Sequence, residues 1–179
     1  MPTFTRNAQQ RFLYSEVAIL AWGASVQRAN LYNSAIPAKD RASDSFRASV
    51  LSFIETQLLS SYKTGCSEAA HIANIERLVE FATAEGGKLL GPDGYKFGVA
   101  QKLLNLLLKY LWCLGHVAEP PHCPVDRLIL AKTSHRNKLN WTEITAASEY
   151  KDAINAIRIV AKAADLSLPQ WELQFYSRR

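Results

Sequence analysis

The sequence has few cysteines, no membrane-length apolar run and no recognisable leader pattern. Its three cysteines are an odd number at irregular spacing, so we expect reduced thiols rather than a disulfide framework. Lys109 interrupts the longest apolar run before it reaches the length that a membrane-spanning helix requires. The first residues lack the charged and apolar regions of a signal peptide. We therefore expect a cytoplasmic protein that has no membrane partner.

Strand-type alternation and internal repeats are also absent from the sequence. The chain has 179 residues, of which 48% are hydrophobic, enough to bury the core of one domain. Apolar residues recur at helical spacing almost throughout, which predicts an all-α fold. We expect a compact single domain over residues 1–179 with six to eight helices.

Capping residues and breakers divide the chain into seven expected helices. Ser43 or Asp44 is a suitable N-cap for the second helix, and Ser67 for the third. Residues 167–170 have the pattern of a capping box with proline in the first turn. The expected helices span residues 6–32, 43–59, 67–85, 97–114, 125–132 and 141–164, and the last begins after Ser167.

The helix over residues 97–114 is apolar almost all the way round, as expected of a helix at the centre of a core. Lys102, Asn105 and Lys109 are its exceptions, and their spacing places them in one narrow stripe. A proline-rich loop follows, and Asp126 lies where the next helix begins, a position that favours an ionised carboxylate. The chain between Lys102 and Asp126 is long enough to bring them face to face across a cleft.

A lysine on a buried helix has either a catalytic role or a structural role. Burial lowers the pKa of a lysine, and the neutral amine is a nucleophile for electrophilic carbon. A nearby carboxylate can accept the proton of the amine or stabilise positive charge on a sugar. The structural alternatives are a buried ion pair, or a lysine whose stem packs while its ammonium reaches water.

Two short motifs, GVAQK at residues 98–102 and CPVD at residues 123–126, carry a resemblance to a known family. Together they resemble the active-site segment of the helix-hairpin-helix DNA glycosylases, which include the endonuclease III and 8-oxoguanine glycosylase enzymes. The resemblance implies that Lys102 attacks C1′ of a flipped nucleotide and that Asp126 assists. It also implies that a hairpin over residues 94–98 presents backbone N–H groups to a DNA phosphate.

The resemblance covers about 40 residues, and the hairpin segment is longer than usual in the superfamily. Archaeal 8-oxoguanine enzymes also have an unusual hairpin, which makes them the nearest-looking branch. The sequence lacks the four-cysteine cluster of the iron–sulfur members, so we expect no cofactor. Nor do we expect a metal site, because the spacing of Cys113, His116, His122 and Cys123 does not fit a zinc site.

The distribution of charge favours an anionic partner. The net charge is +5, and no acidic residue occurs between Arg127 and Thr142. This segment is either a solvated basic loop or a phosphate-binding surface. The resemblance suggests double-stranded DNA containing a modified base as the partner of a monomeric enzyme. The candidate DNA contacts are Gly94, Lys96, Gly98, Arg127, Lys132, His135, Arg136 and Lys138.

A glycosylase also needs apolar walls for an extruded base. Asn105, one turn beyond Lys102, is a candidate for reading a base edge, although it can equally cap a neighbouring backbone group. Aromatic residues dominate protein cores, so each aromatic candidate has an alternative role there. The aromatic candidates for the base pocket are Trp22, Tyr95, Phe97, Trp112 and Trp141.

The sequence thus predicts a DNA glycosylase, with or without abasic-site lyase activity. An oxidised purine is the default substrate, because the resemblance points to that branch. Another modified base, such as a hypermodified phage pyrimidine, is the alternative, and would make the enzyme a phage defence factor rather than a repair enzyme. The rival hypothesis is a non-catalytic basic helical module that binds nucleic acid or a partner protein.

Overall fold

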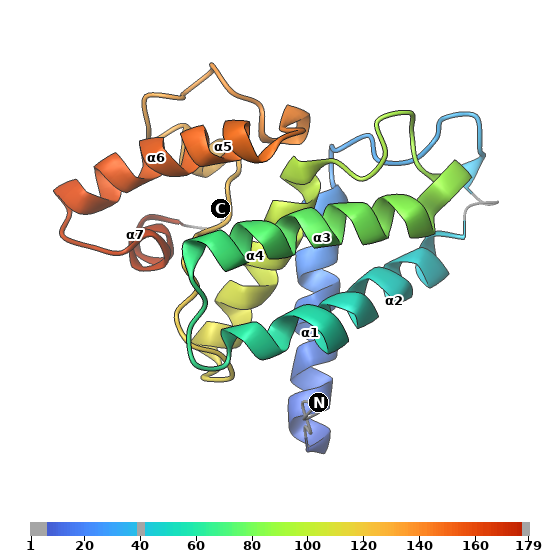
Figure 1. The fold of residues 1–179 in the computed structure, drawn as a ribbon, viewed down its shortest axis with the longest axis horizontal. Coiled ribbons are helices and arrows are strands. Elements are labelled where there is room, and N and C mark those ends of the chain that lie inside the picture. The colour runs from blue at the N-terminus through green and yellow to red at the C-terminus, as the bar shows by residue number, and fades with distance from the viewer. Residues whose placement is uncertain (1–6, 39–41, 177–179) are drawn as a thin grey trace.

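The computed structural model describes residues 7–38 and 42–176, and the regular secondary structure in these ranges is helical apart from an isolated antiparallel bridge between Tyr32 and Leu90. Turns and loops connect the helices. The predicted all-α class is confirmed. Seven α-helices lie within the described residues (Figure 1): α1 (Ala8–Val26), α2 (Ser43–Phe53), α3 (Glu68–Gly86), α4 (Phe97–Cys113), α5 (Arg127–Leu130), α6 (Ala147–Ala163) and α7 (Leu168–Phe175).

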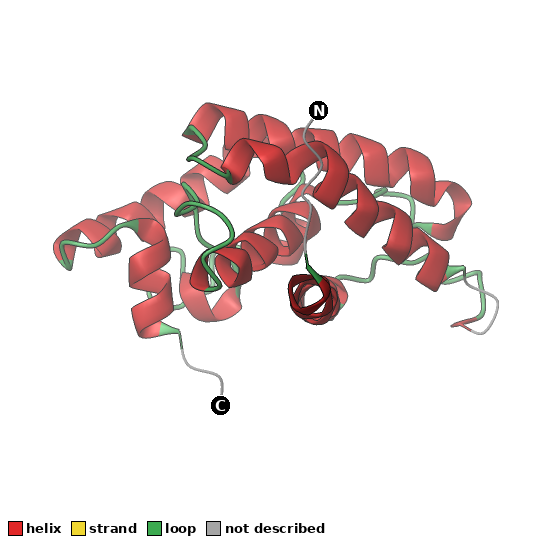
Figure 2. Ribbon diagram, turned by 90° about the horizontal axis from the view of Figure 1, so that it is seen from below, coloured by secondary structure: helices red, strands yellow, loops and turns green. Residues whose placement is uncertain are grey.

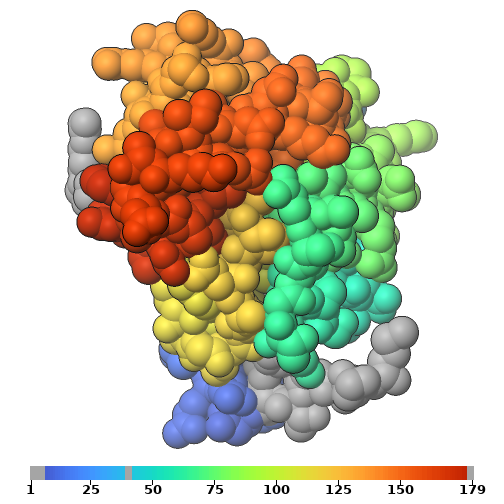
Figure 3. Space-filling view, turned by 60° about the vertical axis from the view of Figure 1, so that its left-hand side comes forward, coloured from blue at the N-terminus to red at the C-terminus, as the bar shows by residue number. Residues whose placement is uncertain are grey.

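Helix α4 forms the centre of the molecule, as predicted for this apolar segment. Thirteen of its seventeen residues are buried. Helix α1 packs against α4, and α3 packs against another side of α4 with α2 beside it (Figures 1 and 2). Helices α6 and α7 close over the rest of α4, and Figure 3 shows their surfaces adjoining those of α3 and of the loop after α4.

The polar stripe predicted on α4 faces the C-terminal part of the chain. Lys102 lies opposite Asp126 at the start of α5, and Asn105 donates a hydrogen bond to the Tyr150 hydroxyl on α6 (3.0 Å). The third member of the stripe, Lys109, binds the Glu172 carboxylate on α7. Each polar side chain of the stripe thus holds a different C-terminal element against the central helix.

One hydrophobic core joins all seven helices, in agreement with a single domain. Its members outside α4 include Tyr14, Phe46, Ile75, Ile129, Ile154 and Trp171, one from each of the other helices. None of the helices in the described ranges is long and apolar enough to cross a membrane.

Several predicted caps are confirmed. The Ser67 hydroxyl accepts a hydrogen bond from the Ala70 N–H (3.2 Å) and begins α3, which ends at a left-handed Gly87. Ser167 and Gln170 form the expected capping box of α7. Asp126 is the N-cap of α5, as its position in the sequence predicted.

Other boundaries differ from the prediction. Helix α1 ends at Val26 rather than near residue 32, because Gln27 is extended and Arg28 has a left-handed backbone (φ 65°). Arg6, predicted as the first helical residue, lies outside the described residues. The N-cap of α2 is Ala42, without a side-chain bond, so neither Ser43 nor Asp44 caps that helix.

The segments around residues 54–62 and 141–146 also depart from regular α-helix. Helix α2 continues through a π turn, η2 (Ile54–Leu58), and a 3-10 turn, η3 (Leu59–Tyr62). The predicted helix 141–164 is instead a short 3-10 turn, η5 (Trp141–Glu143), followed by extended backbone and α6. The Glu149 carboxylate accepts the N–H groups of residues 145 and 146 and so fixes the later start.

Candidate functional site

A pocket of about 400 Å³ lies where α1, α4 and α5 meet, beside Lys102 and Asp126. The C-terminal end of α1 forms one wall, and the segment leading into η5 forms another. The pocket therefore brings together the two residues predicted to carry the chemistry. Its lining residues are Ala24, Gln27, Arg28, Lys102, Asp126, Arg127, Leu128, Asn140, Trp141 and Thr142.

The two oxygens of the Asp126 carboxylate have different partners. Oδ1 accepts hydrogen bonds from the N–H groups of Leu128 (2.9 Å) and Ile129 (3.0 Å), which fixes the side chain at the first turn of α5. Oδ2 lies 3.8 Å from Lys102 Nζ, and the two side chains are 15% and 11% exposed. The distance is longer than a hydrogen bond, so the ammonium or amine is not locked onto the carboxylate.

The surroundings of Lys102 act on its pKa in opposite directions. Burial lowers the pKa below the usual lysine value, Asp126 raises it, and the positive charge of Arg28 lowers it again. The Nζ atom also lies 4.0 Å from the centroid of the Trp141 ring, whose face favours the charged form. The net lowering makes the neutral, nucleophilic amine more accessible than in a solvated lysine.

Gln101 ties the loop before Asp126 to the helix that carries Lys102. Its Nε2 donates to the Val125 carbonyl (2.8 Å), and its Oε1 accepts the Val125 N–H (3.1 Å). The Gln101 side chain is completely buried. Because Gln101 and Val125 directly precede the two candidate residues, this pair of bonds sets the spacing between Lys102 and Asp126. Gln101 was not among the predicted site residues, although an amide next to a lysine in an apolar helix was a signal in the sequence.

Asn105 belongs to a buried polar network and does not line the pocket. It donates to Gln101 Oε1 (3.3 Å) and to the Tyr150 hydroxyl (3.0 Å), and it has no exposed surface. The Tyr150 hydroxyl in turn lies 2.9 Å from His122 Nδ1. The suggestion that Asn105 reads a base edge is therefore corrected, because a base in the pocket cannot reach a side chain sealed beneath α6.

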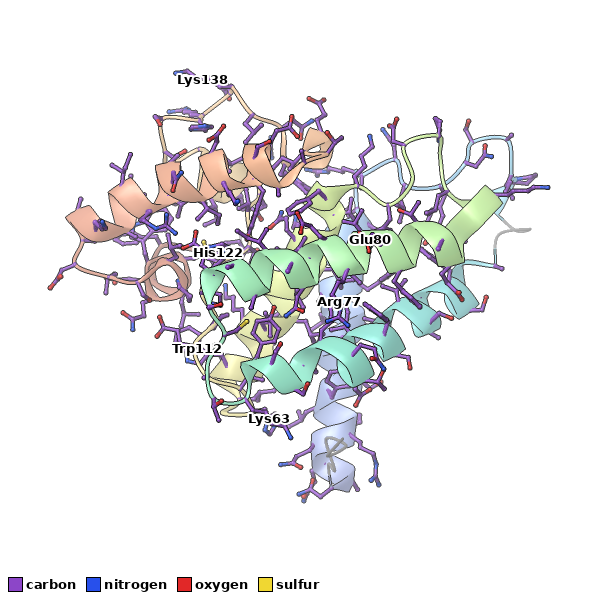
Figure 4. The ribbon with its side chains drawn as sticks, in the orientation of Figure 1. Lys63, Arg77, Glu80, Trp112, His122 and Lys138 are labelled. Atoms are coloured by element: carbon purple, nitrogen blue, oxygen red, sulfur yellow. The ribbon has the colours of Figure 1, made fainter. Side chains whose placement is uncertain are left out.

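Trp141 is the aromatic candidate that lines the pocket. Tyr95 and Phe97 are buried in the core, and Trp22 packs edge-on against Phe46 there. Trp112 lies near the opposite end of α4 and is labelled in the lower part of Figure 4. A rise of 1.5 Å per residue places it about 15 Å from Lys102 along the helix axis. These four aromatic residues do not form a base pocket, because they lie in the core or too far away.

Three N–H groups of the predicted hairpin are bonded within the protein. The Gly94 N–H donates to the Gly91 carbonyl (3.0 Å), the Tyr95 N–H to the Thr83 hydroxyl (3.0 Å) and the Gly98 N–H to the Ile144 carbonyl (2.9 Å). The phosphate-binding role of Gly94 and Gly98 is therefore corrected, since these donors are already occupied.

Gly98 has a different function in packing. A Cβ atom at this position would overlap the carbonyl oxygen of Trp141. The absence of a side chain lets the η5 segment approach α4 closely, and this contact places the Trp141 ring against Lys102. Gly98 thus shapes the pocket from behind rather than binding a ligand.

The cationic residues predicted to contact DNA do not all lie at the pocket. Lys96 pairs with Asp93 (2.9 Å) and does not line the pocket, and His135 is half-buried in the turn after α5. Arg127 lines the pocket itself, and Lys138 projects from the outer loop in Figure 4. The remaining cations of the basic loop, Lys132 and Arg136, are exposed on the other side of α5.

Two pocket residues that the sequence did not predict, Gln27 and Arg28, directly follow α1. The helix was predicted to continue to residue 32, which gave no reason to place these side chains near Lys102. Among the described residues, no three His, Cys, Asp or Glu side chains are placed to hold a metal ion. The His122 imidazole faces Glu68 and Tyr150, and Cys123 is buried.

Neither a protein-family model, nor a curated protein, nor a solved structure matches this chain. The candidate function therefore depends on the motifs of the sequence and on the geometry of the pocket.

Proposed function

We propose that this protein is a DNA glycosylase related to the helix-hairpin-helix superfamily, with Lys102 as nucleophile and Asp126 as the assisting carboxylate. The observation that carries the proposal is the meeting of these two groups, 3.8 Å apart, at the wall of an accessible pocket. An amine of lowered pKa and a fixed carboxylate are the two components that base excision through a covalent intermediate requires.

In the proposed reaction, the neutral Lys102 amine forms a bond to C1′ as the bond from C1′ to the base breaks. The electron pair of the broken bond leaves with the base, which takes up a proton from solvent. Asp126 Oδ2 accepts a proton from the attached nitrogen and passes it to O4′ as the bond from C1′ to O4′ breaks. This ring opening gives a protonated Schiff base between the lysine and C1′, and its hydrolysis by water releases the sugar aldehyde, regenerates the amine and returns one proton to solvent.

A second version of the chemistry uses the carboxylate without the amine. Asp126 would stabilise the positive charge that develops on the sugar and would activate a water molecule, leaving an intact abasic site. Its Oδ2 atom is available for this role because Oδ1 alone caps α5. The two versions differ in one property, the covalent trapping of the enzyme.

Borohydride reduction tests the proposal on duplexes that carry single modified bases or an abasic site. We expect a covalent protein–DNA product that is absent in the Lys102→Ala variant. We expect Asp126→Asn to reduce the rate of excision much more than the affinity for DNA. Lys151→Ala, an exposed lysine on α6, is the matched control. Excision without trapping would support the carboxylate version, and neither excision nor trapping on any duplex would contradict the proposal.

The same duplex panel addresses the substrate. We propose an oxidised purine in double-stranded DNA as the first substrate to test, which would make the protein a repair enzyme. A bulky modified pyrimidine of phage DNA is the second, and excision of that base would indicate antiviral defence. A pocket of about 400 Å³ lies within the usual range for small-molecule sites.

The rival function is a non-catalytic module that binds nucleic acid or a partner through the exposed cations of residues 127–138. In that case Lys102 only packs on the Trp141 ring and neutralises Asp126. Such a module would show salt-dependent DNA association, and Lys102→Ala would change neither excision nor trapping because neither would occur.

A further inference from the structure

Two more pockets adjoin the Lys102 pocket, and together the three surround α5. We call the pocket with Lys102 the central pocket. The loop pocket, of about 370 Å³, shares Arg127, Asn140 and Trp141 with it. The C-terminal pocket, of about 330 Å³, shares Leu128 with the central pocket and Ala131 with the loop pocket. The candidate site is therefore one part of a larger hollowed surface.

Positive charge predominates around all three pockets. Arg28 and Lys102 line the central pocket, and Arg127 and Lys138 line the loop pocket. Two acidic residues oppose these cations. Asp126 caps α5, and Glu143 of the loop pocket accepts a hydrogen bond from the Asn140 side-chain amide (3.1 Å).

The C-terminal pocket combines two cations with an exposed aromatic ring. Lys132 and Arg136 line it without an acidic residue. The Phe175 side chain from the end of α7 is 42% exposed, although its ring also rests on Trp171 (5.6 Å between centroids). Exposed aromatic rings among cations are the pattern by which proteins hold unpaired nucleotides, with bases stacked on the rings and phosphates at the cations.

We propose that the surface around α5 binds one DNA strand over several nucleotides whose bases are unpaired. The nucleotide to be excised occupies the central pocket, and its two neighbours occupy the loop pocket and the C-terminal pocket. The inference rests on the proposed function for the role of the central pocket. It adds that the enzyme holds the flanking nucleotides out of the duplex, with Phe175 as a stacking platform.

The test measures binding alone, with a single-stranded oligonucleotide that contains no modified base. Fluorescence anisotropy of the full chain at several salt concentrations gives the affinity and its salt dependence. Phe175→Ala should weaken binding about tenfold, because a base–aromatic stack contributes that order of affinity. Lys132→Ala/Arg136→Ala should flatten the slope of log K against log salt by about 1.4, the value for two phosphate contacts to a single strand.

Matched controls separate this surface from general effects. Leu173→Ala removes an exposed apolar side chain from the same helix α7, away from the pocket. Lys151→Ala/Lys162→Ala removes two exposed cations from α6. Circular dichroism and urea unfolding check the fold of each variant. The double cation variant changes only exposed side chains, so it keeps the test informative if Phe175→Ala does not fold.

Pocket variants that bind no more weakly than the controls would overturn the inference. Tight binding of undamaged duplex that is independent of Phe175 would also overturn it, because paired DNA offers no base to that ring. Since no step requires excision, this result is separate from the proposed function. Strand binding with the expected losses but no excision or trapping would refute the glycosylase, while excision with unaffected binding would refute only the stacking surface.

Discussion

Mild acid should destabilise this protein through two buried histidines. His71 and His122 have no exposed surface, and their rings meet edge to face with centroids 4.9 Å apart. Burial lowers the pKa of His71 to about 3 and that of His122 to about 4. Figure 4 shows His122 between α3 and α6, with Glu68 Oε1 3.4 Å from its Nε2 atom. Both rings are therefore neutral in the folded protein at pH 5.

The magnitude follows from the difference between the folded and unfolded pKa values. The unfolded chain binds a proton at each histidine below about pH 6.5, and the folded protein does so only near pH 3 to 4. The stabilisation is thus fully present above pH 6.5 and is lost as the pH falls. At pH 5 each histidine lowers the free energy of unfolding by about 2 kcal/mol, or about 4 kcal/mol together, relative to its value near neutral pH. The slope of the free energy of unfolding against pH approaches about 2.7 kcal/mol per pH unit.

Urea unfolding followed by circular dichroism between pH 7.5 and 4.5 measures this loss. A decrease of about 4 kcal/mol is a large part of the stability of a typical domain. His122→Gln should reduce the slope by about half, whereas His116→Gln, outside the cluster, should leave it unchanged. Glu68 does not account for the effect, because its pKa is lowered in the folded protein. The stabilisation from its ionised carboxylate is therefore lost at lower pH than that from the histidines. A free energy of unfolding that is equal at pH 7.5 and 5 would refute the reasoning.

Three further predictions concern the candidate site. Gly98→Ala should lower the free energy of unfolding by about 3 kcal/mol, measured in urea, because the new methyl group displaces the backbone of Trp141 from α4. Gln101→Leu should cost about 1–3 kcal/mol in the same assay and reduce excision, because the chain before Asp126 loses both bonds that hold it. Borohydride trapping on a preformed abasic site should reach half its maximum below pH 10.5, since burial lowers the pKa of Lys102. Asp126→Asn should move that midpoint to still lower pH, and an unshifted midpoint would count against the pair.

The central part of the fold could be predicted because it depends on local patterns. Residues 97–114 are apolar on nearly every face, so their helix had to be buried. The stripe of Lys102, Asn105 and Lys109 then required partners, because a buried polar side chain is costly without one. The N-cap preference of an aspartate placed Asp126 at the start of α5. Each of these predictions depends only on residues that are neighbours along a single helix.

The walls of the pocket could not be predicted, because they depend on contacts between distant segments. Trp141 reaches Lys102 because Gly98 accepts the close approach of the η5 backbone and donates to the Ile144 carbonyl. The same contact interrupts the helix expected over residues 141–164. Composition showed that aromatic residues were available, but the identity of the lining residue followed from the break before α6.

The segment over residues 94–98 differs from the hairpin that the resemblance implied. The two motifs, at residues 98–102 and 123–126, predicted that Lys102 lies opposite Asp126, and the structure has these side chains 3.8 Å apart. A phosphate site needs free N–H groups, and whether they are free depends on hydrogen bonds to residues outside the motifs. Here the Thr83 hydroxyl and the Ile144 carbonyl take two of the donors. The proposed phosphate contacts are therefore assigned to side chains around α5 rather than to the N–H groups of Gly94 and Gly98.

Helix α4 carries two lysine–carboxylate pairs, and their difference bears on whether Lys102 is structural. Lys109 Nζ lies 2.9 Å and 2.6 Å from the oxygens of Glu172, which is 2% exposed, so this pair is closed and tight. Lys102 and Asp126 stand 3.8 Å apart at the wall of a pocket. A buried ion pair offsets the cost of desolvation only with short bonds and good geometry. The first pair meets that condition and the second does not, although both join the same helix to the C-terminal part of the chain. A structural role accounts for the closed pair, and for Lys102 it accounts for the contact with the Trp141 ring at 4.0 Å. The two hypotheses differ in the pocket beside Lys102, because a nucleophile that receives a substrate needs that space and a structural lysine does not.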